Sequence, residues 1–345
     1  MGIVEEVRIA KRTGFCYGVR EAIDKAKEAS AAGKATHTLG QVVHNEGVVR
    51  DLQDLGIETV ETLDDVDHGA AVVIRAHGVR PDVMERAESR GLEVIDGTCT
   101  WVIQEHRELT KLVEEGYTIV LLGTPKHAEV VGMLGFAPDA IVVDEEEEWE
   151  AAIPRKKRMA LISQSTQPPW KFEKLAAFMV GRAHELKIVN TVCPVTIRRQ
   201  QDTMEAAKDV DLMVVVGGRS SANTKELTRL CEIAGTPAIQ VEGVRDLTDA
   251  EVFAEARVVG VTGGTSTPIE DLRDVAQHIL KMAGTPDVQA RASELAGAAL
   301  AVAATPAGRT TSLPTTARPA SGAGSSDRWP AGASPRSSER HASAS

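Results

Sequence analysis

Short runs of Val, Ile and Leu alternate with helical segments along most of this chain, and this alternation limits the fold more than any other feature. Each run is continuously apolar and ends in glycine or a small polar residue, which is typical of a parallel strand buried on both faces. The runs are AVVIRAHG (71–78), TIVLLGTP (118–125), IVVDEE (141–146), MALISQST (159–166), DLMVVVGG (211–218) and RVVGVTGG (257–264). Helical segments include VREAIDKAKEA (19–29), VVRDLQDLG (48–56), PDVMERAESRG (81–91) and SANTKELTRLCEIAG (221–235). The last two segments end on a glycine, as a helix often does. The pattern predicts an α/β fold with parallel sheets.

The composition changes near residue 285. Residues 285–345 consist mainly of Ala, Ser, Pro, Thr, Gly and Arg, with Trp329 as the single aromatic residue. Such a segment buries too little apolar surface to offset the entropy lost on ordering, so we expect 285–345 to be a disordered, low-complexity tail. The part before it is interpreted as three α/β lobes, 1–97, 98–190 and 191–284.

The net charge of the chain limits the classes of partner that it can bind. The formal net charge is −11, whereas a protein that binds a nucleic-acid backbone needs a basic face. The chain has no run of about 18 apolar residues, so we expect no transmembrane helix. Its first residues, MGIVEEVRIAKRTGF, lack the apolar stretch of a signal peptide. We therefore predict a cytoplasmic protein whose ligand is a small molecule, not a nucleic acid or a membrane.

The four cysteines differ in their settings. A cytoplasmic location argues against disulfides, which leaves metal binding, catalysis or burial. Cys16, Cys99 and Cys193 each precede a stretch that suits a helix, and a helix N-terminus favours the thiolate that metals bind. Three thiolates from three lobes would hold a metal or an iron–sulfur cluster with one position open, although spacing alone equally fits three unrelated buried cysteines. Cys231 falls on the apolar stripe of a helix and is interpreted as buried and inert. The pair Arg198–Arg199 either supports a cluster electrostatically or only begins a helix.

Polar side chains gather where the predicted strands end. Ligands of parallel α/β sheets bind at the carboxyl ends of the strands. The residues at these places are His44, His77, His127, Glu129, Ser165, Thr166, Ser221, Asn223 and Ser266. A single histidine in such a loop is more often structural or solvated. The same polar character at several strand ends predicts one shared site.

A set of short motifs connects these residues with a known family. RTGFCYGVREAI, VVHNEGVVRDL, VVIRAHGV, DGTCTWV, HAEVVG, SQST, NTVC and GVTGGTSTP follow one another between about residues 5 and 283. In content and order this set resembles the 4-hydroxy-3-methylbut-2-enyl diphosphate reductases, which perform the last step of the non-mevalonate isoprenoid pathway. The resemblance implies three lobes in a pseudo-threefold arrangement around a central [4Fe–4S] cluster, one per chain.

The resemblance also implies a role for each residue. The cluster ligands of the family match Cys16, Cys99 and Cys193, and one iron stays open for the substrate hydroxyl. The diphosphate-binding residues match His44, His77, His127, Ser221, Asn223 and Ser266. The carboxylate that delivers protons matches Glu129, and a pocket threonine near the substrate hydroxyl matches Thr166, with Ser165 as its neighbour. The implied reaction is a reductive dehydroxylation to isopentenyl and dimethylallyl diphosphate, with two electrons and with protons through Glu129.

The chain departs from the usual family motifs at four places. Ala222 stands where the family commonly has a second serine before Asn223. Thr100 and Ala128 replace prolines, and Val131 replaces an acid. None of these changes removes a predicted ligand, acid or histidine, so we expect them to affect substrate affinity and loop rigidity more than chemistry.

Two other functions stay open at this point. A quinolinate-synthase-like enzyme would share the three-lobed iron–sulfur plan, although the contexts GFCYGV, HN and AHG fit that family less well. A non-catalytic metal-binding module could have kept the same residues. A zinc hydrolase is disfavoured because the chain has no HExxH motif. No convincing nucleotide or flavin motif is present, so we expect electrons from a separate ferredoxin or flavodoxin, with NADPH as a candidate source.

Overall fold

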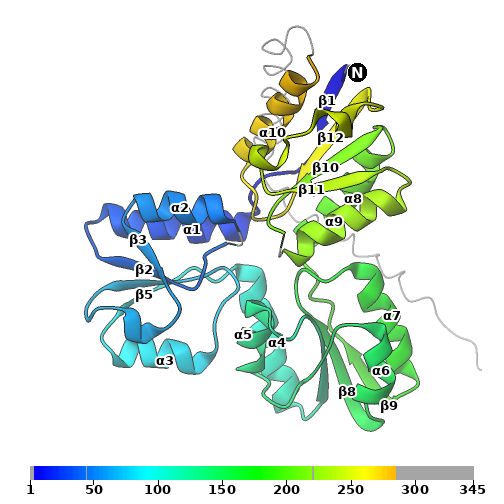
Figure 1. The fold of residues 1–345 in the computed structure, drawn as a ribbon. Helices are drawn as coiled ribbons and strands as arrows, with labels where there is room; N and C mark the ends of the chain where they lie inside the picture. The colour runs from blue at the N-terminus through cyan, green and yellow to red at the C-terminus, as the bar shows by residue number, and fades with distance from the viewer. Residues whose placement is uncertain (1–3, 44, 220, 285–345) are drawn as a thin grey trace, which may run out of the picture. The chain divides into compact units, whose positions relative to one another are not determined.

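The computed structural model describes residues 4–43, 45–219 and 221–284. These residues belong to one compact unit, Met1–Ala304, and they form three sheets of four parallel strands each, flanked by helices (Figure 1). The predicted α/β fold with parallel sheets is confirmed. Two predictions lie outside the described residues: the role of His44 and the disordered tail 285–345.

The first sheet has the strand order β3-β2-β4-β5. Its elements are β2 (Thr36–Leu39), β3 (Ile57–Val60), β4 (Ala71–Ile74) and β5 (Glu93–Asp96), with α1 (Tyr17–Ala31), α2 (Glu46–Asp54), η1 (Leu63–Asp65) and α3 (Pro81–Ser89). The central strands β2 and β4 pair from Thr36 and Ala71 to Leu39 and Ile74. Helices α1 and α2 cover one face of this sheet and α3 the other (Figure 1).

The second sheet has the order β7-β6-β8-β9. Its elements are β6 (Thr118–Leu122), β7 (Ile141–Val143), β8 (Lys156–Ser163) and β9 (Ala183–Ile188), with α4 (Thr100–Glu114), α5 (Ala128–Leu134), α6 (Glu146–Ala152) and α7 (Pro169–Val180). Leu109 of α4 and Met133 of α5 pack on one face. Trp149 of α6 and Phe172 of α7 pack on the opposite face.

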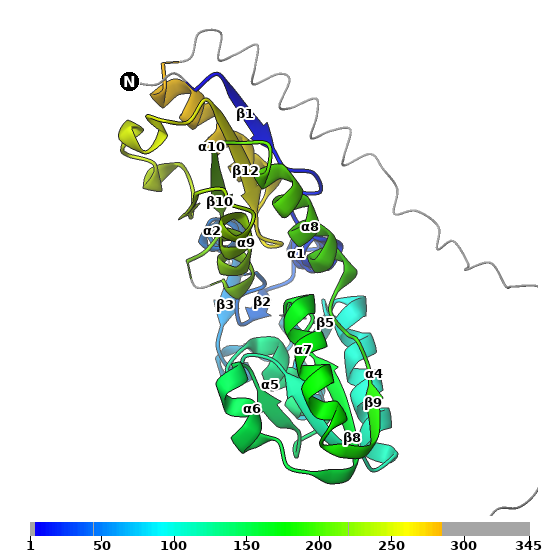
Figure 2. The same ribbon diagram turned by 90° about the vertical axis from the view of Figure 1, so that its right-hand side faces the viewer.

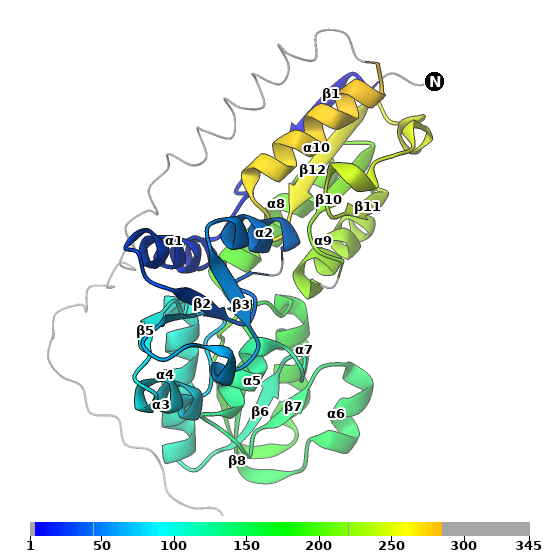
Figure 3. The same cartoon turned by 60° about the vertical axis from the view of Figure 1, so that its left-hand side comes forward.

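The third sheet has the order β1-β12-β10-β11. Its elements are β1 (Glu6–Ile9), β10 (Leu212–Val216), β11 (Ala238–Val241) and β12 (Val258–Gly263), with α8 (Pro194–Ala207), α9 (Ala222–Ile233), η2 (Val244–Asp246), η3 (Ala250–Phe253) and α10 (Ile269–Met282). Helix α10 covers one face through residues such as Ile279, as Figure 3 shows, and α9 packs on the other through Leu227.

The first strand of the chain lies in the last sheet. β1 runs beside β12 (Figure 2), and Glu6 pairs with Val258. The division into 1–97, 98–190 and 191–284 stays a prediction, but its first segment contains a strand of the third sheet. The pairing has a physical reason. Without β1, one edge of β12 would have unpaired backbone N–H and C=O groups, and the short strand before Cys16 provides their hydrogen-bond partners.

The three sheets share one topology. In each, the first and third strands lie side by side, the second strand lies at one edge and the fourth at the other. β1 takes the place of the fourth strand in the third sheet. The chain leaves the first strand toward one edge and the third strand toward the other, which makes their carboxyl ends a topological switch point where ligands bind. We call the first and third strands of each sheet its switch strands. The predicted site residues follow these switch strands in the sequence.

Some strands that the apolar pattern did not predict lie at the edges of the sheets. The predicted apolar runs correspond to β4, β6, β7, β8, β10 and β12, whereas β5 and β9 have mostly half-exposed or exposed residues. An edge strand such as β5 or β9 can carry polar residues because one side faces solvent, so its sequence need not be a continuous apolar run. The edge strand β7 is apolar in sequence although two of its three residues are half-exposed. The predicted helix ends are confirmed: Gly91 and Gly235 follow α3 and α9 with φ of 68° and 91°.

Candidate functional site

Each of the three predicted cluster cysteines is the residue immediately before a helix. Cys16, Cys99 and Cys193 are the N-caps of α1, α4 and α8, and each follows the fourth strand of a sheet. The thiol of Cys16 accepts the backbone N–H of Val19 at 3.5 Å. The first-turn N–H groups of a helix are unpaired and carry partial positive charge, so all three sulfurs lie where a thiolate is stabilised.

The backbone fixes all three cysteines by the same contact. The N–H of Cys16 donates to the carbonyl of Thr265 at 3.1 Å, that of Cys99 to Ala76 at 3.0 Å, and that of Cys193 to Ser165 at 2.8 Å. Each accepting residue follows the third strand of a sheet. Each also directly precedes a predicted site residue, namely Ser266, His77 and Thr166. Each predicted metal ligand is therefore held next to a predicted substrate-binding or catalytic residue, once per sheet.

Close packing brings the cysteines of different sheets near one another. A Cβ atom added to Gly18, two residues after Cys16, would lie 2.5 Å from the sulfur of Cys99. The indole N–H of Trp101, two residues after Cys99, donates to the carbonyl of Thr191 at 2.7 Å, two residues before Cys193. The start of α1 therefore contacts the start of α4, which in turn contacts the segment before α8.

The protonation of the thiols reflects their shared surroundings. Burial raises the pKa of Cys16, Cys99 and Cys193, and the first-turn N–H groups of the following helix lower it. A neighbouring thiolate raises each pKa further, because like charges repel. Ionisation of all three thiols is therefore unfavourable without a cation. Binding of a cation would favour the thiolates and release their protons.

A buried guanidinium lies beside Cys16. Arg199, on α8, is 3 % exposed and donates to three carbonyls: Gly14 at 2.6 Å, Gly263 at 3.0 Å and Gly264 at 2.6 Å. Burial lowers its pKa to about 10, and the negative charge of Cys16 opposes that shift. Arg198 is exposed. Of the two interpretations of this arginine pair, electrostatic support fits Arg199, and Arg198 is an ordinary surface residue of the helix.

The two predicted site histidines that the structure describes meet edge to face. The rings of His77 and His127 have centroids 5.3 Å apart at an angle of 86°. His127 is the N-cap of α5, and its Nδ1 accepts the N–H of Glu129 at 3.2 Å. An accepting Nδ1 leaves the proton of a neutral ring on Nε2, so His127 has an N–H donor away from the helix.

The carboxylate of Glu129 is fully enclosed. Glu129 is 1 % exposed, and Ser165 donates its N–H to Oε1 at 2.5 Å and its hydroxyl to Oε2 at 2.9 Å. Burial raises the pKa of Glu129, while the hydrogen bonds from Ser165 lower it. The hydroxyl of Thr166 accepts the side-chain amide of Gln164 at 2.8 Å, so its own proton is available to another group. An acid, a hydroxyl and two imidazoles thus follow the switch strands of two sheets.

The third sheet contributes amide and hydroxyl groups. Ser221 is the N-cap of α9 and accepts the N–H of Thr224 at 3.3 Å. Asn223 is 8 % exposed, and neither its Nδ2 nor its Oδ1 has a hydrogen-bond partner among the described residues. Ser266 is half-buried in the turn before α10. A buried amide without a partner costs about 1–3 kcal/mol, and a phosphate oxygen is an acceptor that would satisfy its Nδ2, whereas Oδ1 would need a separate donor.

The three thiols are donors of the kind that an iron–sulfur cluster takes, since its ligands are thiolates that bind different irons. Within 4–43, 45–219 and 221–284, no three His, Cys, Asp or Glu side chains are arranged to hold one metal ion. Each thiol stands at the start of a helix, and a buried cation lies beside one of them.

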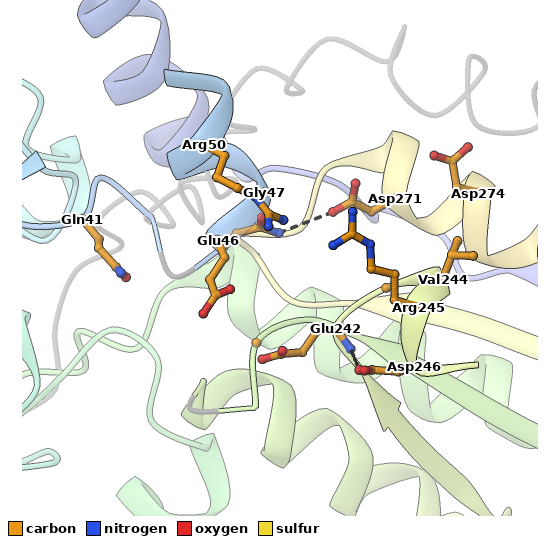
Figure 4. Close-up of a pocket in the computed structure, with 13 residues that line it drawn as sticks. Gln41, Glu46, Gly47, Arg50, Glu242, Val244, Arg245, Asp246, Asp271 and Asp274 are labelled. Carbon is orange, nitrogen blue, oxygen red and sulfur yellow. Dashed lines mark hydrogen bonds between the residues drawn. The ribbon is translucent and has the colours of Figure 1, made fainter. Parts of the chain in front are cut away.

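The pocket in Figure 4 is lined by residues other than the described site residues. It has a volume of about 590 Å³ and lies between the start of α2, η2 and α10. The predicted site residues that the structure describes are not among those that line it. Its charged residues are Glu46, Arg50, Glu242, Arg245, Asp246, Asp271 and Asp274. The excess of carboxylates disfavours a diphosphate.

Three of the four departures from the family motifs lie at the first residue of a helix. Thr100, Ala128 and Ala222 begin α4, α5 and α9, whereas α8 begins with Pro194. Proline suits this position because its missing N–H has no partner within the helix. Thr100 and Ala128 each add a backbone donor in place of a proline, Ala222 lacks the hydroxyl of a serine, and all three helices are kept.

Two further expectations can be compared with the structure. Cys231 is buried on α9 as predicted, and burial raises its pKa to about 12. Among the described helices, none is both long and apolar enough to cross a membrane. The sequence assigned no role to Glu105, a fully buried acid on α4 next to Glu129. Its only signal in the sequence is a charged residue on the apolar face of a predicted helix.

The chain is similar over most of its length to proteins of one kind. A family model described as LytB protein matches residues 7–280. The 4-hydroxy-3-methylbut-2-enyl diphosphate reductase of Anaeromyxobacter sp. (strain Fw109-5) is 38% identical over 284 residues, which cover 81% of this chain and 100% of that protein. The reductase of the same name from a Nitratiruptor species is 33% identical over 278 residues, covering 80% and 99%.

Two solved structures are similar as well. One is (E)-4-hydroxy-3-methyl-but-2-enyl diphosphate reductase, described as the terminal enzyme of the non-mevalonate pathway, with a TM-score of 0.62 and 32% identity over 80% of this chain and 99% of that one. The other is the E-1-hydroxy-2-methyl-but-2-enyl-4-diphosphate reductase from Plasmodium falciparum, with a TM-score of 0.76 and 26% identity over 82% and 89%.

Proposed function

Because this chain belongs to the LytB family, we propose that it is an iron–sulfur oxidoreductase that reduces 4-hydroxy-3-methylbut-2-enyl diphosphate to isopentenyl and dimethylallyl diphosphate. The observation that carries the proposal is the contact repeated in each sheet, from a cysteine N–H to the carbonyl before a polar strand-end residue. It joins thiol ligands to groups that bind phosphate and move protons. Family membership favours this function over a quinolinate synthase or a non-catalytic metal-binding module.

The metal ligands of the proposal are Cys16, Cys99 and Cys193, which would hold a [4Fe–4S] cluster. When bound, such a cluster supplies a Lewis-acidic iron and electrons one at a time. The protein lowers the cost of three thiolates with helix N-termini and with the charge of Arg199. The electrons would come from a separate ferredoxin or flavodoxin, with NADPH as a candidate source.

The diphosphate would be held by groups from all three sheets. His77 and His127 offer imidazole N–H donors, and Ser221, Asn223 and Ser266 offer hydroxyl and amide donors. His44 follows β2 in the sequence and belongs to the same proposed set. The unpaired amide of Asn223 is the best support, because a buried polar group needs a partner.

Protons would be delivered by Glu129. The overall reaction consumes two protons and two electrons and releases one water. Glu129 is buried and raised in pKa, which suits a general acid near neutral pH. Thr166, with its hydroxyl already accepting from Gln164, can donate its own proton toward the substrate.

A direct test is turnover of the hydroxylated diphosphate with a chemical reductant under anaerobic conditions. We expect a brown protein with a paramagnetic signal on reduction, lost in Cys16→Ser and kept in the control Cys231→Ser. A colourless protein that carries zinc would contradict the proposal. A brown protein that leaves the substrate unchanged would favour the non-catalytic module or the other synthase.

A further inference from the structure

Glu105 is a buried acid to which the proposed reaction assigns no role. It lies on α4 with an exposed fraction of 0 %, and no N–H or O–H of the described residues donates to either carboxyl oxygen. Six residues of helix place it about 9 Å along the axis from Cys99, so it is not at a ligand position. A carboxylate buried in this way without a donor is costly, which means that its protonation state must be explained.

The polar neighbour of Glu105 is another acid. Helices α4 and α5 pack against each other, and the side chain of Glu129, in the first turn of α5, interacts with that of Glu105. Ser165 already donates to both oxygens of Glu129. Two ionised carboxylates would repel each other in this enclosed place. A proton on Glu105 makes it a donor to Glu129, and that single proton gives both acids a partner.

The surrounding charges decide which acid holds the proton. Burial raises the pKa of Glu105 well above its usual value, and the negative groups facing it, Glu129, Cys193 and Cys99, raise it further. For Glu129 burial also raises the pKa, but the hydrogen bonds from Ser165 and Glu105 lower it. The donors to Glu129 thus favour its charged form, so the proton rests on Glu105 and reaches Glu129 through the hydrogen bond between them.

We propose that Glu105 and Glu129 form a buried carboxyl pair that keeps one proton at neutral pH, held by Glu105 and shared with Glu129 through a hydrogen bond. Glu105 is then a positioning residue that keeps a proton beside the acid. The catalytic part of this statement rests on the proposed function, whereas the shared proton does not.

Infrared difference spectroscopy tests the pair without substrate. The full-length protein, purified anaerobically, is compared at neutral pH with Glu105→Gln and with Glu114→Gln, a matched change at an exposed position of the same helix. We expect a protonated-carboxyl band in the wild type that shifts in D₂O, is kept in Glu114→Gln and is lost in Glu105→Gln. A wild-type spectrum without that band, or a band that Glu105→Gln leaves unchanged, would overturn the pair. If Glu105→Gln does not fold, Glu105→Met replaces it with a side chain of similar length and no carboxyl.

Stability as a function of pH is a second readout that does not need activity. A carboxyl whose pKa is raised on folding favours the unfolded state as the pH rises above about 4.5, the usual value for the acid. The melting temperature of Glu105→Gln should therefore fall less than that of the wild type between pH 5 and pH 8. Parallel curves for the two proteins would contradict a protonated Glu105.

The pH dependence of turnover tests the link to catalysis. Removing the last proton from two neighbouring acids is harder than removing it from one. In Glu105→Gln we expect the alkaline loss of kcat to begin at least one pH unit lower, with KM unchanged because Glu105 is enclosed by protein. Superposable profiles, together with the expected infrared result, would leave the pair intact and refute its catalytic part.

Discussion

Ser165 donates its backbone N–H and its hydroxyl to the two carboxylate oxygens of Glu129. The carbonyl of Ser165 also accepts the N–H of Cys193 at 2.8 Å. A single residue in the loop after β8, Ser165, therefore fixes both the proposed acid and a proposed cluster ligand. The sequence indicated Ser165 only as a neighbour of Thr166, because the partner that matters lies 36 positions away.

Ser165→Ala should weaken the acid without removing it. The hydroxyl bond stabilises the charged form of Glu129, so its loss raises the pKa of Glu129 further. A hydrogen bond to a charged group contributes about 1.5–3 kcal/mol, so we expect kcat to fall about 10-fold or more, with its alkaline limb at higher pH. Ser89→Ala, at the exposed last residue of α3, is the control. An unchanged pH profile would mean that the hydroxyl does not affect Glu129.

Glu129→Gln should separate binding from chemistry. The amide keeps the size of the side chain but cannot deliver a proton, so turnover should drop by ~10²-fold or more while substrate affinity stays near normal. Kinetics and equilibrium binding measure the two effects, with Glu147→Gln as an exposed control. Full activity would remove Glu129 from the mechanism.

Arg199→Lys should destabilise the site although the charge is kept. The planar guanidinium reaches carbonyls of Gly14, Gly263 and Gly264 at once, and an ammonium cannot reproduce that geometry. A hydrogen bond from a charged group contributes about 1.5–3 kcal/mol, so the melting temperature and the iron content should both fall. Arg198→Lys, its exposed neighbour, should change neither. Equal behaviour of the two variants would refute the distinction between these arginines.

Gly18→Ala should disturb Cys99 through space. The added methyl group would lie 2.5 Å from the sulfur and 2.8 Å from the Cβ of Cys99, closer than real atoms approach, so one of the two helix starts must move. We expect a lower cluster content per chain, measured as iron and sulfide, with the fold kept. Gly181→Ala is the control, because a Cβ there meets nothing within 4 Å. Full cluster content in Gly18→Ala would contradict the contact.

His106 should make the protein sensitive to acid. It is 8 % exposed, stacks on Phe136 at 4.2 Å, and burial lowers its pKa to about 4. Between about pH 6.5 and pH 4 the His106 imidazole is protonated in the unfolded state but stays neutral in the folded state. The free energy of unfolding therefore decreases as the pH falls through this range. Since one pKa unit corresponds to about 1.4 kcal/mol, the loss reaches up to about 3 kcal/mol.

The melting temperature of His106→Gln should therefore depend less on pH than that of the wild type between pH 7 and pH 5. His184→Gln, at an exposed histidine, should follow the wild type. If His106→Gln and the wild type lose the same stability on acidification, the buried ring is not the cause.

The central strands could be predicted because burial on both faces leaves a mark in the sequence. β4, β12 and the second half of β8 are apolar runs, and the polar residues after them, such as His77 and Ser266, follow from where such strands end. Of the outer strands, β7 was predicted by its apolar run, but β9 could not be predicted in the same way. β9 reads AHELKI, which alone gives no reason to place it in a sheet.

The sequence by itself determined the chemistry that is available: three cysteines before helices, a polar residue at each switch strand, and motifs that a family shares. The local sequence pattern was enough to predict these features, because residues close in the sequence determine where a strand ends and where a helix begins. Only the tertiary structure decided that β1 completes the third sheet, that Arg199 and not Arg198 lies beside Cys16, and that Glu105 faces Glu129. These relationships join residues distant in the chain, and burial fixes them, since a hidden charge or hydrogen-bonding group must find a partner wherever the fold brings one.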